Sequence, residues 1–237
     1  MPQVAAAIAV AITALLMSTS AFAQSPPSRP GPYVIDIRAP MSGLPSASAF
    51  HPVLPANTLV PKRGFGLDVG GHVYVATLGV SRIGLGVDVL RVRGTAVTTS
   101  ATTTSSTSTG TTTSGVAAAG ALSAAGRIDA AMTMTAIAPQ LSFNFGTREG
   151  WSYLSGGYGA AQMRTTATGD LQGPLTGRTT LVRDDGRSAA INYGGGARWF
   201  IRGHLAVGFD LRFHQIAAAG TRPSTKLVVA SAGLSLR

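Results

Sequence analysis

The sequence predicts an all-β fold, an eight-stranded antiparallel up-and-down transmembrane β-barrel, on the basis of three observations. Apolar and polar residues alternate with a period of two in six segments, and a seventh, from Trp151 to Arg164, is glycine-rich with an ambiguous facing. The connections between these segments are alternately short and long. Only 12% of the 237 residues are charged, against about 25% in a typical soluble domain. A barrel that faces water needs a charged exterior, so the scarcity of charge favours strands whose apolar face meets lipid.

The alternation is clearest at residues 204–215, where Val207 and Phe209 take one face and Gly208 and Asp210 take the other. The seven segments predict strands at about 64–77, 81–94, 129–146, 151–165, 189–201, 204–215 and 226–237. Single-chain barrels of bacterial outer membranes have an even number of strands. A further strand must therefore precede residue 64, and residues 33–37 are the segment available for it.

The rest of the chain divides into a leader, a proline-rich segment and loops. Residues 1–23 contain an apolar stretch followed by Ala21-Phe22-Ala23, which predicts a cleaved signal peptide. Residues 24–63 form a proline-rich N-terminal segment, and the barrel is predicted to occupy 64–237. A Ser/Thr-rich loop is predicted at 95–128, and further long loops at 165–188 and 216–225. Short turns are expected on the periplasmic side and long loops outside.

Two more features favour a membrane barrel over a soluble one. The polar face is rich in glycine, which suits a narrow lumen and would make a poor solvent face. Six aromatic residues lie near the short turns, as in an interfacial girdle: Phe143, Phe145, Trp151, Tyr153, Trp199 and Phe200.

The stretch from Gly194 to Arg212 contains three glycines, an aromatic pair, a basic turn and an alternating strand that ends in Asp210-Leu211-Arg212. It resembles the strand–turn–strand of the outer-membrane β-barrel domain family, the small eight-stranded barrels similar to outer membrane protein A. The resemblance covers about 64–237. It implies a location in the cell outer membrane and insertion by the barrel-assembly machinery. Family members often end in an aromatic residue that this machinery reads, whereas the last residues here are Leu236 and Arg237.

Glycine and aspartate recur two residues apart in three strands, so that both face the lumen while their apolar neighbours face lipid. Basic residues lie near these aspartates, which predicts a belt of opposite charges that acts as an ion-pair plug. A narrow path for ions or small solutes is the alternative. The predicted lumenal charge belt consists of Asp68, His72, Asp88, Asp210, Arg212 and His214.

No catalytic, cofactor-binding or metal site is predicted, and the chain is expected not to be an enzyme. It has no cysteine, and its four histidines are scattered. The sequence Asp184-Asp185-Gly186 is typical of a turn, and this interpretation is favoured over a cation-binding loop.

The formal net charge is +10, and 17 of the 19 basic residues are arginines. Guanidinium groups pair bidentately with phosphate, and the outer leaflet of such bacteria is anionic. Nucleic acid is excluded as a partner because the basic residues lack interleaved aromatics and the chain is predicted to be exported. The expected partners are outer-membrane lipid and lipopolysaccharide, whose phosphates are predicted to contact Arg91, Arg93, Arg164, Arg183 and Arg187.

These observations predict a non-enzymatic outer-membrane barrel with a structural or surface-interaction role through basic, Ser/Thr-rich external loops. Two alternatives stay open. One is a narrow pore for small solutes or ions, and the other is a soluble periplasmic barrel that carries a ligand in an apolar interior.

Substitution of Val207 by arginine tests the predicted facing. Val207→Arg should hinder insertion, at a cost of about 2–4 kcal/mol near the midplane of the bilayer. Ala206→Arg separates the models, because it is harmless on the water-facing side of a carrier and crowds its neighbours in a narrow lumen. Gel mobility of unheated and boiled membrane extracts reports the folded barrel. A Val207→Arg variant that assembles as well as the wild type contradicts the assignment.

Overall fold

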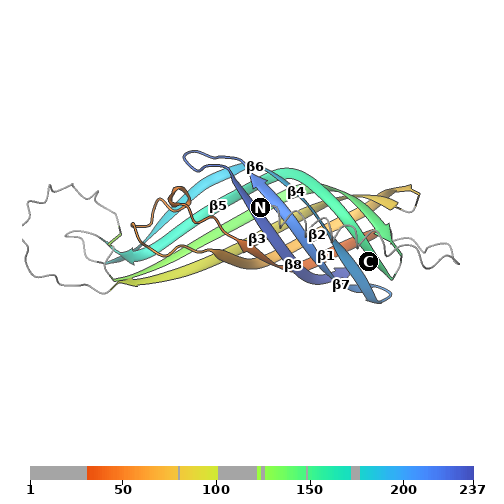
Figure 1. The fold of residues 1–237 in the computed structure, drawn as a ribbon, viewed down its shortest axis with the longest axis horizontal. Helices are drawn as coiled ribbons and strands as arrows, with labels where there is room; N and C mark the ends of the chain where they lie inside the picture. The colour runs from red at the N-terminus through yellow and green to blue at the C-terminus, as the bar shows by residue number, and fades with distance from the viewer. Residues whose placement is uncertain (1–30, 80, 101–121, 124–125, 148, 172–176) are drawn as a thin grey trace, which may run out of the picture.

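A computed structural model describes residues 31–79, 81–100, 122–123, 126–147, 149–171 and 177–237. These residues form eight strands in one closed antiparallel barrel, in which each strand pairs with its neighbours in sequence and the first pairs with the last (Figure 1). The strands are β1 (Tyr33–Gly43), β2 (Arg63–Leu78), β3 (Ser81–Ser100), β4 (Gly126–Gly146), β5 (Gly150–Asp170), β6 (Arg178–Arg202), β7 (Leu205–Ile216) and β8 (Thr225–Leu236). The predicted fold class is confirmed.

The first strand, β1, contains the segment at 33–37 and continues to Gly43. It pairs with β2 on one side and with β8 on the other, and so closes the barrel. Short turns join β2 to β3, β4 to β5 and β6 to β7 at one end, whereas the long connections lie at the other (Figure 1). A 3-10 turn, η1 (Ser48–Phe50), interrupts the connection from β1 to β2.

The middle four strands are much longer than the outer ones. Strands β3, β4, β5 and β6 contain 20, 21, 21 and 25 residues, whereas β1, β7 and β8 contain 11 or 12. Crossing a bilayer takes only about 9–11 tilted residues. The four long strands therefore extend beyond the others as a protruding sheet (Figure 1).

The predicted loops at 95–128 and 165–188 are therefore wrong at both ends, where the structure has strand instead of loop. Strand β3 continues to Ser100 and β4 begins at Gly126, while β5 ends at Asp170 and β6 begins at Arg178. Threonine and valine are common in these extensions and favour extended backbone, and unbroken ladder pairing satisfies their amide groups. The centre of the Ser/Thr-rich tract and the predicted signal peptide lie outside the described residues.

Apolar side chains face outward around the membrane-spanning part. On β7, Phe209 is 49% exposed, whereas its neighbour Asp210 is 2% exposed. Outward apolar residues continue on this strand from Leu205 to Phe213, close to the roughly 9–11 residues needed to cross a bilayer. An apolar exterior with a polar interior is the arrangement of a transmembrane barrel and contradicts the soluble-carrier alternative. Among the described residues, no helix is long and apolar enough to span a membrane.

The polarity of the two faces inverts along the long strands. On β3, Val87 and Val89 face outward and Asp88 faces inward; further along, Arg91 is exposed and Leu90 is buried. The interior beyond this level is an apolar core formed by Leu44, Phe50, Leu90, Val92, Met132, Met134, Ala136, Ala161, Met163, Ala190, Ile216, Leu227 and Val229. The inversion marks the surface of the bilayer, because apolar groups gather inside wherever water surrounds the barrel.

The connection from β1 to β2 folds into the open end of the barrel. Leu44 and Phe50 pack in the apolar core, and the Thr165 hydroxyl donates a hydrogen bond of 2.9 Å to the Phe50 carbonyl. Val53 and Leu54 pack further out on a second cluster, which contains Leu122, Ile128 and Ala167. This segment therefore caps the lumen from the outside.

Two valines on the outward face of β3 test the position of the bilayer surface. Val87→Arg should lower the free energy of unfolding by about 2–4 kcal/mol, because it places a charge in lipid. Val97→Arg, on the same face in the protruding sheet, should change it by less than about 0.5 kcal/mol. Urea unfolding of the barrel in lipid vesicles measures both values. Equal losses in the two variants would place the bilayer surface elsewhere.

Candidate functional site: a lumenal ion network and outward arginines

Strand β1 directs two charged residues into the lumen. Asp36 and Arg38 alternate with Ile35 and Ile37, so the charged pair faces inward and the isoleucines face lipid. Asp36 is 1% exposed and Arg38 is 4% exposed. Both are therefore buried charges that need partners from other strands.

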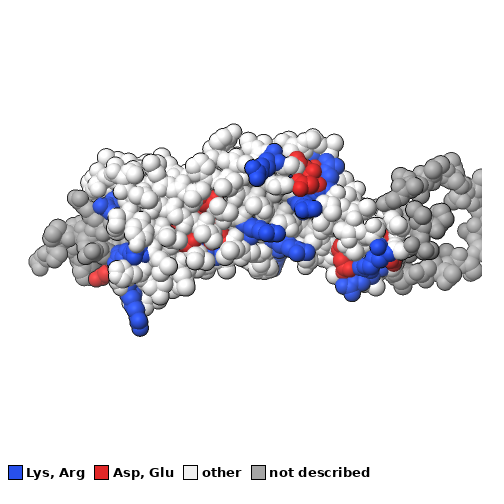
Figure 2. All heavy atoms as spheres, turned by 180° about the vertical axis from the view of Figure 1, so that it is seen from behind, with Lys and Arg blue, Asp and Glu red and all other residues white. Residues whose placement is uncertain are grey.

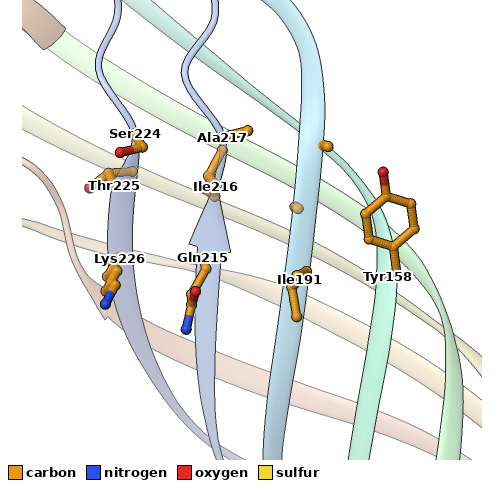
Figure 3. A pocket seen from close by; sticks show the side chains of 10 residues that line it. Tyr158, Ile191, Gln215, Ile216, Ala217, Ser224, Thr225 and Lys226 are labelled. Atoms are coloured by element: carbon orange, nitrogen blue, oxygen red, sulfur yellow. The ribbon is translucent and has the colours of Figure 1, made fainter.

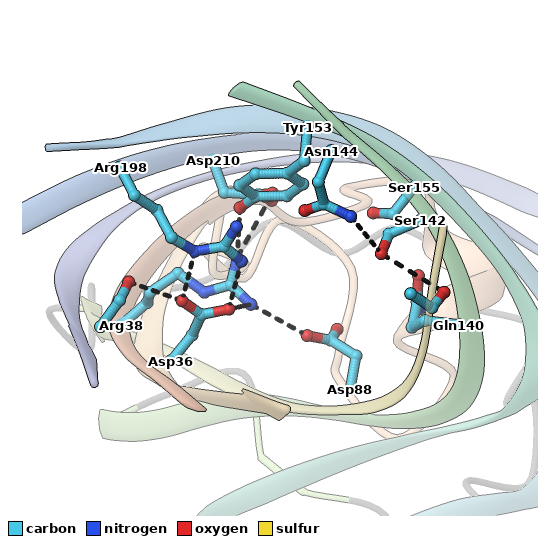
Figure 4. A network of polar contacts seen from close by, with 12 residues as sticks. Asp36, Arg38, Asp88, Gln140, Ser142, Asn144, Tyr153, Ser155, Arg198 and Asp210 are labelled. Atoms are coloured by element: carbon cyan, nitrogen blue, oxygen red, sulfur yellow. Dashed lines mark hydrogen bonds and ion pairs between the residues drawn. The ribbon is translucent and has the colours of Figure 1, made fainter. Parts of the chain in front are cut away.

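Arg38 lies at the centre of the polar lumen (Figure 4). Its Nε atom lies 3.1 Å from Asp68 Oδ2, and its Nη2 atom lies 3.1 Å from Asp88 Oδ1. Its Nη1 atom lies 3.3 Å from Asp210 Oδ2 and donates a hydrogen bond of 3.0 Å to the Tyr153 hydroxyl. One guanidinium group thus joins β1 to β2, β3, β5 and β7.

A second guanidinium, that of Arg198 on β6, forms a bidentate pair with Asp36. Its Nε and Nη2 atoms donate hydrogen bonds of 2.8 and 2.6 Å to the two carboxylate oxygens. The Ser235 hydroxyl of β8 donates a third, of 2.6 Å. Arg198 also stacks on the Tyr153 ring, with its guanidinium carbon 3.9 Å from the ring centroid, and Tyr153 donates a hydrogen bond of 2.7 Å to Asp210.

The third guanidinium, that of Arg212 on β7, links the ion pairs to neutral polar groups. It donates two hydrogen bonds of 3.1 Å to the Asp210 carboxylate. It also donates to Gln140 Oε1 at 2.9 Å, Ser155 Oγ at 3.0 Å and Asn192 Oδ1 at 3.2 Å. These groups from β4, β5 and β6 extend the network across the lumen.

The lumenal network is defined here as Asp36, Arg38, Asp68, Asp88, Tyr153, Arg198, Asp210 and Arg212. Each of its four carboxylates pairs with at least one of its three guanidiniums, as buried charges must. The gap beside Asp36, Arg38 and Arg198, next to the barrel wall, has no room for a water molecule. The network joins strands on all sides of the lumen through ion pairs and hydrogen bonds, and so can brace the barrel.

The predicted charge belt lies in the lumen, but its members differ in role. Asp68, Asp88, Asp210 and Arg212 take part in the network. His72 and His214 are 3% and 1% exposed, and their ring nitrogens make no hydrogen bond within the described part of the chain. Sequence reasoning missed Asp36, Arg38, Arg198 and Tyr153, which complete the network.

Part of the predicted aromatic girdle is wrong. Trp151 and Tyr153 are 2% and 3% exposed, because their positions on β5 face the lumen. Phe200 packs against Trp151, with a centroid separation of 4.7 Å. Phe143 and Trp199 do face outward, at 44% and 52% exposure. The inward aromatics instead close the lumen beside the short turns.

Four arginines from the predicted set face outward just beyond the apolar band. The register aligns Arg91 with Thr135, Gln162 and Arg187 across four strands. The next row aligns Arg93 with Thr133, Arg164 and Asp184. Rows on one face lie about 7 Å apart along a strand, so the side chains share one surface. We call Arg91, Arg93, Arg164 and Arg187 the outward arginines.

Arg183 is not part of this surface. It pairs in register with Thr165, whose side chain is buried in the interior, so Arg183 points to the same inner face. There it forms an ion pair with Asp185 and donates a hydrogen bond of 2.7 Å to the Thr221 hydroxyl. A register irregularity between Gln162 and Arg164 separates it from Arg187.

The distribution of charge follows the same division (Figure 2). Basic side chains lie over the half of the barrel nearer the long connections and at the end with the short turns, while much of the surface between is white. Within the described ranges, no group of three or more His, Asp or Glu residues could hold a metal ion.

Comparisons with known proteins find similarity only between structures. No protein-family model matches the chain, and no curated protein matches its sequence. The attachment invasion locus protein Ail of Yersinia pestis is 12% identical, with 87% of this chain and 98% of that chain covered and a TM-score of 0.48. Neisserial surface protein A is 12% identical, with 87% and 97% covered and a TM-score of 0.44.

The outer membrane protease OmpT of Escherichia coli is 8% identical, with 90% of this chain and 99% of that chain covered and a TM-score of 0.43. At these identities and TM-scores, none of the three similarities assigns a function to this chain.

Removal of the central guanidinium tests the brace. Arg38→Met leaves three carboxylates without their shared partner and should lower the free energy of unfolding by about 3–5 kcal/mol. The matched control, Arg127→Met, removes an exposed pair with Asp129 and should cost less than about 1 kcal/mol. Adding Asp68→Asn to Arg38→Met should recover part of the loss. Urea unfolding in lipid vesicles measures these values, and a loss below 1 kcal/mol in Arg38→Met would contradict the role of the network.

Proposed function

We propose that this chain is a non-enzymatic outer-membrane barrel that presents a binding surface for anionic partners on the outside of the cell. The outward arginines carry this proposal. They form two rows that lie next to apolar Phe65 and Leu67 of β2, at the level where the exterior changes from lipid-facing to water-facing. Phosphate groups of lipopolysaccharide occupy that level of an outer membrane.

The positive charge of the two rows of outward arginines favours binding of an anion. Arg91, Arg93 and Arg187 are exposed and have no hydrogen-bond or ion-pair partner among the described residues. Asp184 lies in register with Arg164 and offsets part of its charge. The Gln162 amide donates hydrogen bonds of 2.8 Å to both Asp184 carboxylate oxygens and holds the pKa of this carboxyl below its usual value. The positive field is therefore strongest at Arg91, Arg93 and Arg187.

The protruding sheet supports a surface-interaction role. Strands β3 to β6 continue beyond the last pairs that β2 and β7 make with them, Phe65 with Arg93 and Ala190 with Ile216. The outer ends of β3 and β6 thus have edges that neither neighbour pairs. Unpaired strand edges are recognition elements for extended segments of other proteins.

A pore is the weaker candidate. The gap beside Asp36, Arg38 and Arg198 has no room for water, and the apolar core with Phe50 lies between the network and the outside. Eight-stranded barrels are filled by their side chains as a rule. Both layers favour a sealed barrel over a conducting one.

Loss of two outward arginines tests the proposal. A cation near an anionic surface contributes about 1 kcal/mol, so Arg91→Ala with Arg93→Ala should weaken binding of fluorescent lipopolysaccharide by about thirty-fold. The control, Arg127→Ala with Arg178→Ala, removes the same charge from the tip of the protruding sheet, where both arginines pair with Asp129. Fluorescence polarisation in detergent gives both affinities, and equal affinities would reject the proposal.

A further inference from the structure

A groove indents the outer surface where β6, β7 and β8 approach the long connections (Figure 3). Its volume is about 420 Å³, within the range of roughly 300–1,000 Å³ that small-molecule sites occupy. The lining residues are Tyr158, Ala189, Ala190, Ile191, Gln215, Ile216, Ala217, Ser224, Thr225 and Lys226. Three of the four outward arginines lie on β3 and β5, and the fourth, Arg187 on β6, lies beyond the residues that line the groove, so the groove is a separate feature.

The groove forms where a row of large outward side chains is followed, toward the long connections, by small residues. The register aligns the outward side chains of Tyr158, Ile191, Gln215 and Lys226, and these form one wall. The next outward residue on β6 is Ala189, which pairs with Ala160 of β5. Strand β7 ends beside it at Ile216, so two methyl groups and open backbone form the floor.

One end of the wall is apolar and the other end carries a cation. Tyr158 and Ile191 are 65% and 49% exposed, and they stand at the outer limit of the lipid-facing band. Lys226 lines the groove, and Arg187 is the next outward residue on β6 after Ala189. Neither cation has a hydrogen-bond or ion-pair partner among the described residues. An apolar slot with a free cation, Lys226, at one end of its wall matches a molecule that carries a phosphate beside an acyl chain.

We infer that this groove holds one lipopolysaccharide molecule through its lipid A part. An acyl chain packs against Ile191 and Tyr158, and a lipid A phosphate pairs with Lys226 at the end of the same row. The inference rests on the proposed outer-membrane location, because the long connections then face the leaflet that contains lipopolysaccharide. It adds to the proposed function a specific seat, in which the acyl chain and the phosphate are recognised together.

Native mass spectrometry of the full chain, folded in detergent with purified lipid A, tests the groove. The wild type should retain one lipid A molecule. Ala189→Trp fills the groove and Lys226→Gln removes a rim cation, and each should reduce the retained fraction at least five-fold. The matched controls are Ala232→Trp, on the outward face of β8 away from the groove, and Lys62→Gln, which changes the only other lysine. Both should retain lipid A as the wild type does.

Gel mobility before and after boiling identifies the variants that have folded, and Lys226→Gln keeps the test decisive if Ala189→Trp does not fold. Full retention by the folded groove variants overturns the inference. It is also overturned if these variants lose phosphatidylglycerol, offered in a parallel experiment, but keep lipid A.

If Arg91→Ala with Arg93→Ala weakens lipopolysaccharide binding while the groove variants do not, the inference about the groove is wrong and the proposed function stands. A wild-type chain that retains no lipid A overturns the groove, and the polarisation measurement then decides the proposed function separately.

Discussion

Charge compensation around Arg38 is the constraint on which the barrel depends. The guanidinium contacts carboxylates from β2, β3 and β7 and the Tyr153 hydroxyl of β5. Through Asp36, its neighbour on β1, the network also reaches Arg198 on β6 and Ser235 on β8. A slip of one residue in β1, β2, β3, β6 or β7 would move a charge from the lumen into lipid. The buried ion pairs therefore specify strand register as well as filling space.

One part of the barrel is surrounded by lipid and the other by water, and the two parts bury opposite kinds of side chain. Where lipid surrounds it, apolar groups such as Val87 face outward, and the polar groups must satisfy one another inside. Where water surrounds it, Leu90 and Met134 pack inside, and arginine and threonine face outward. The outward arginines and the groove with Lys226 both lie at the boundary between these regions. The proposed lipid contacts thus follow from where the polarity changes.

Period-two alternation was enough to predict six strands, because one face is lipid-exposed and the other is not, whereas the strand at 151–165 lacked a clear alternation. The eighth strand was harder, since proline dominates its surroundings and only 33–37 stood out. That uncertainty hid Asp36 and Arg38, although their alternation with Ile35 and Ile37 was a usable signal. The facing of Trp151 and Tyr153 could not be predicted, because Gly156, Gly157 and Gly159 interrupt the segment and it shows no clear period.

The inversion between Val89 and Arg91 also fixes the thickness of membrane that suits this barrel. Apolar residues cover the wall from the short turns up to this level, and a packed core beyond it prevents the arginines from being drawn into hydrocarbon. A bilayer of another thickness must therefore deform around the barrel, which costs free energy for each ångström of hydrophobic mismatch. The barrel is therefore most stable in a bilayer whose hydrocarbon thickness equals the height of its outward apolar band.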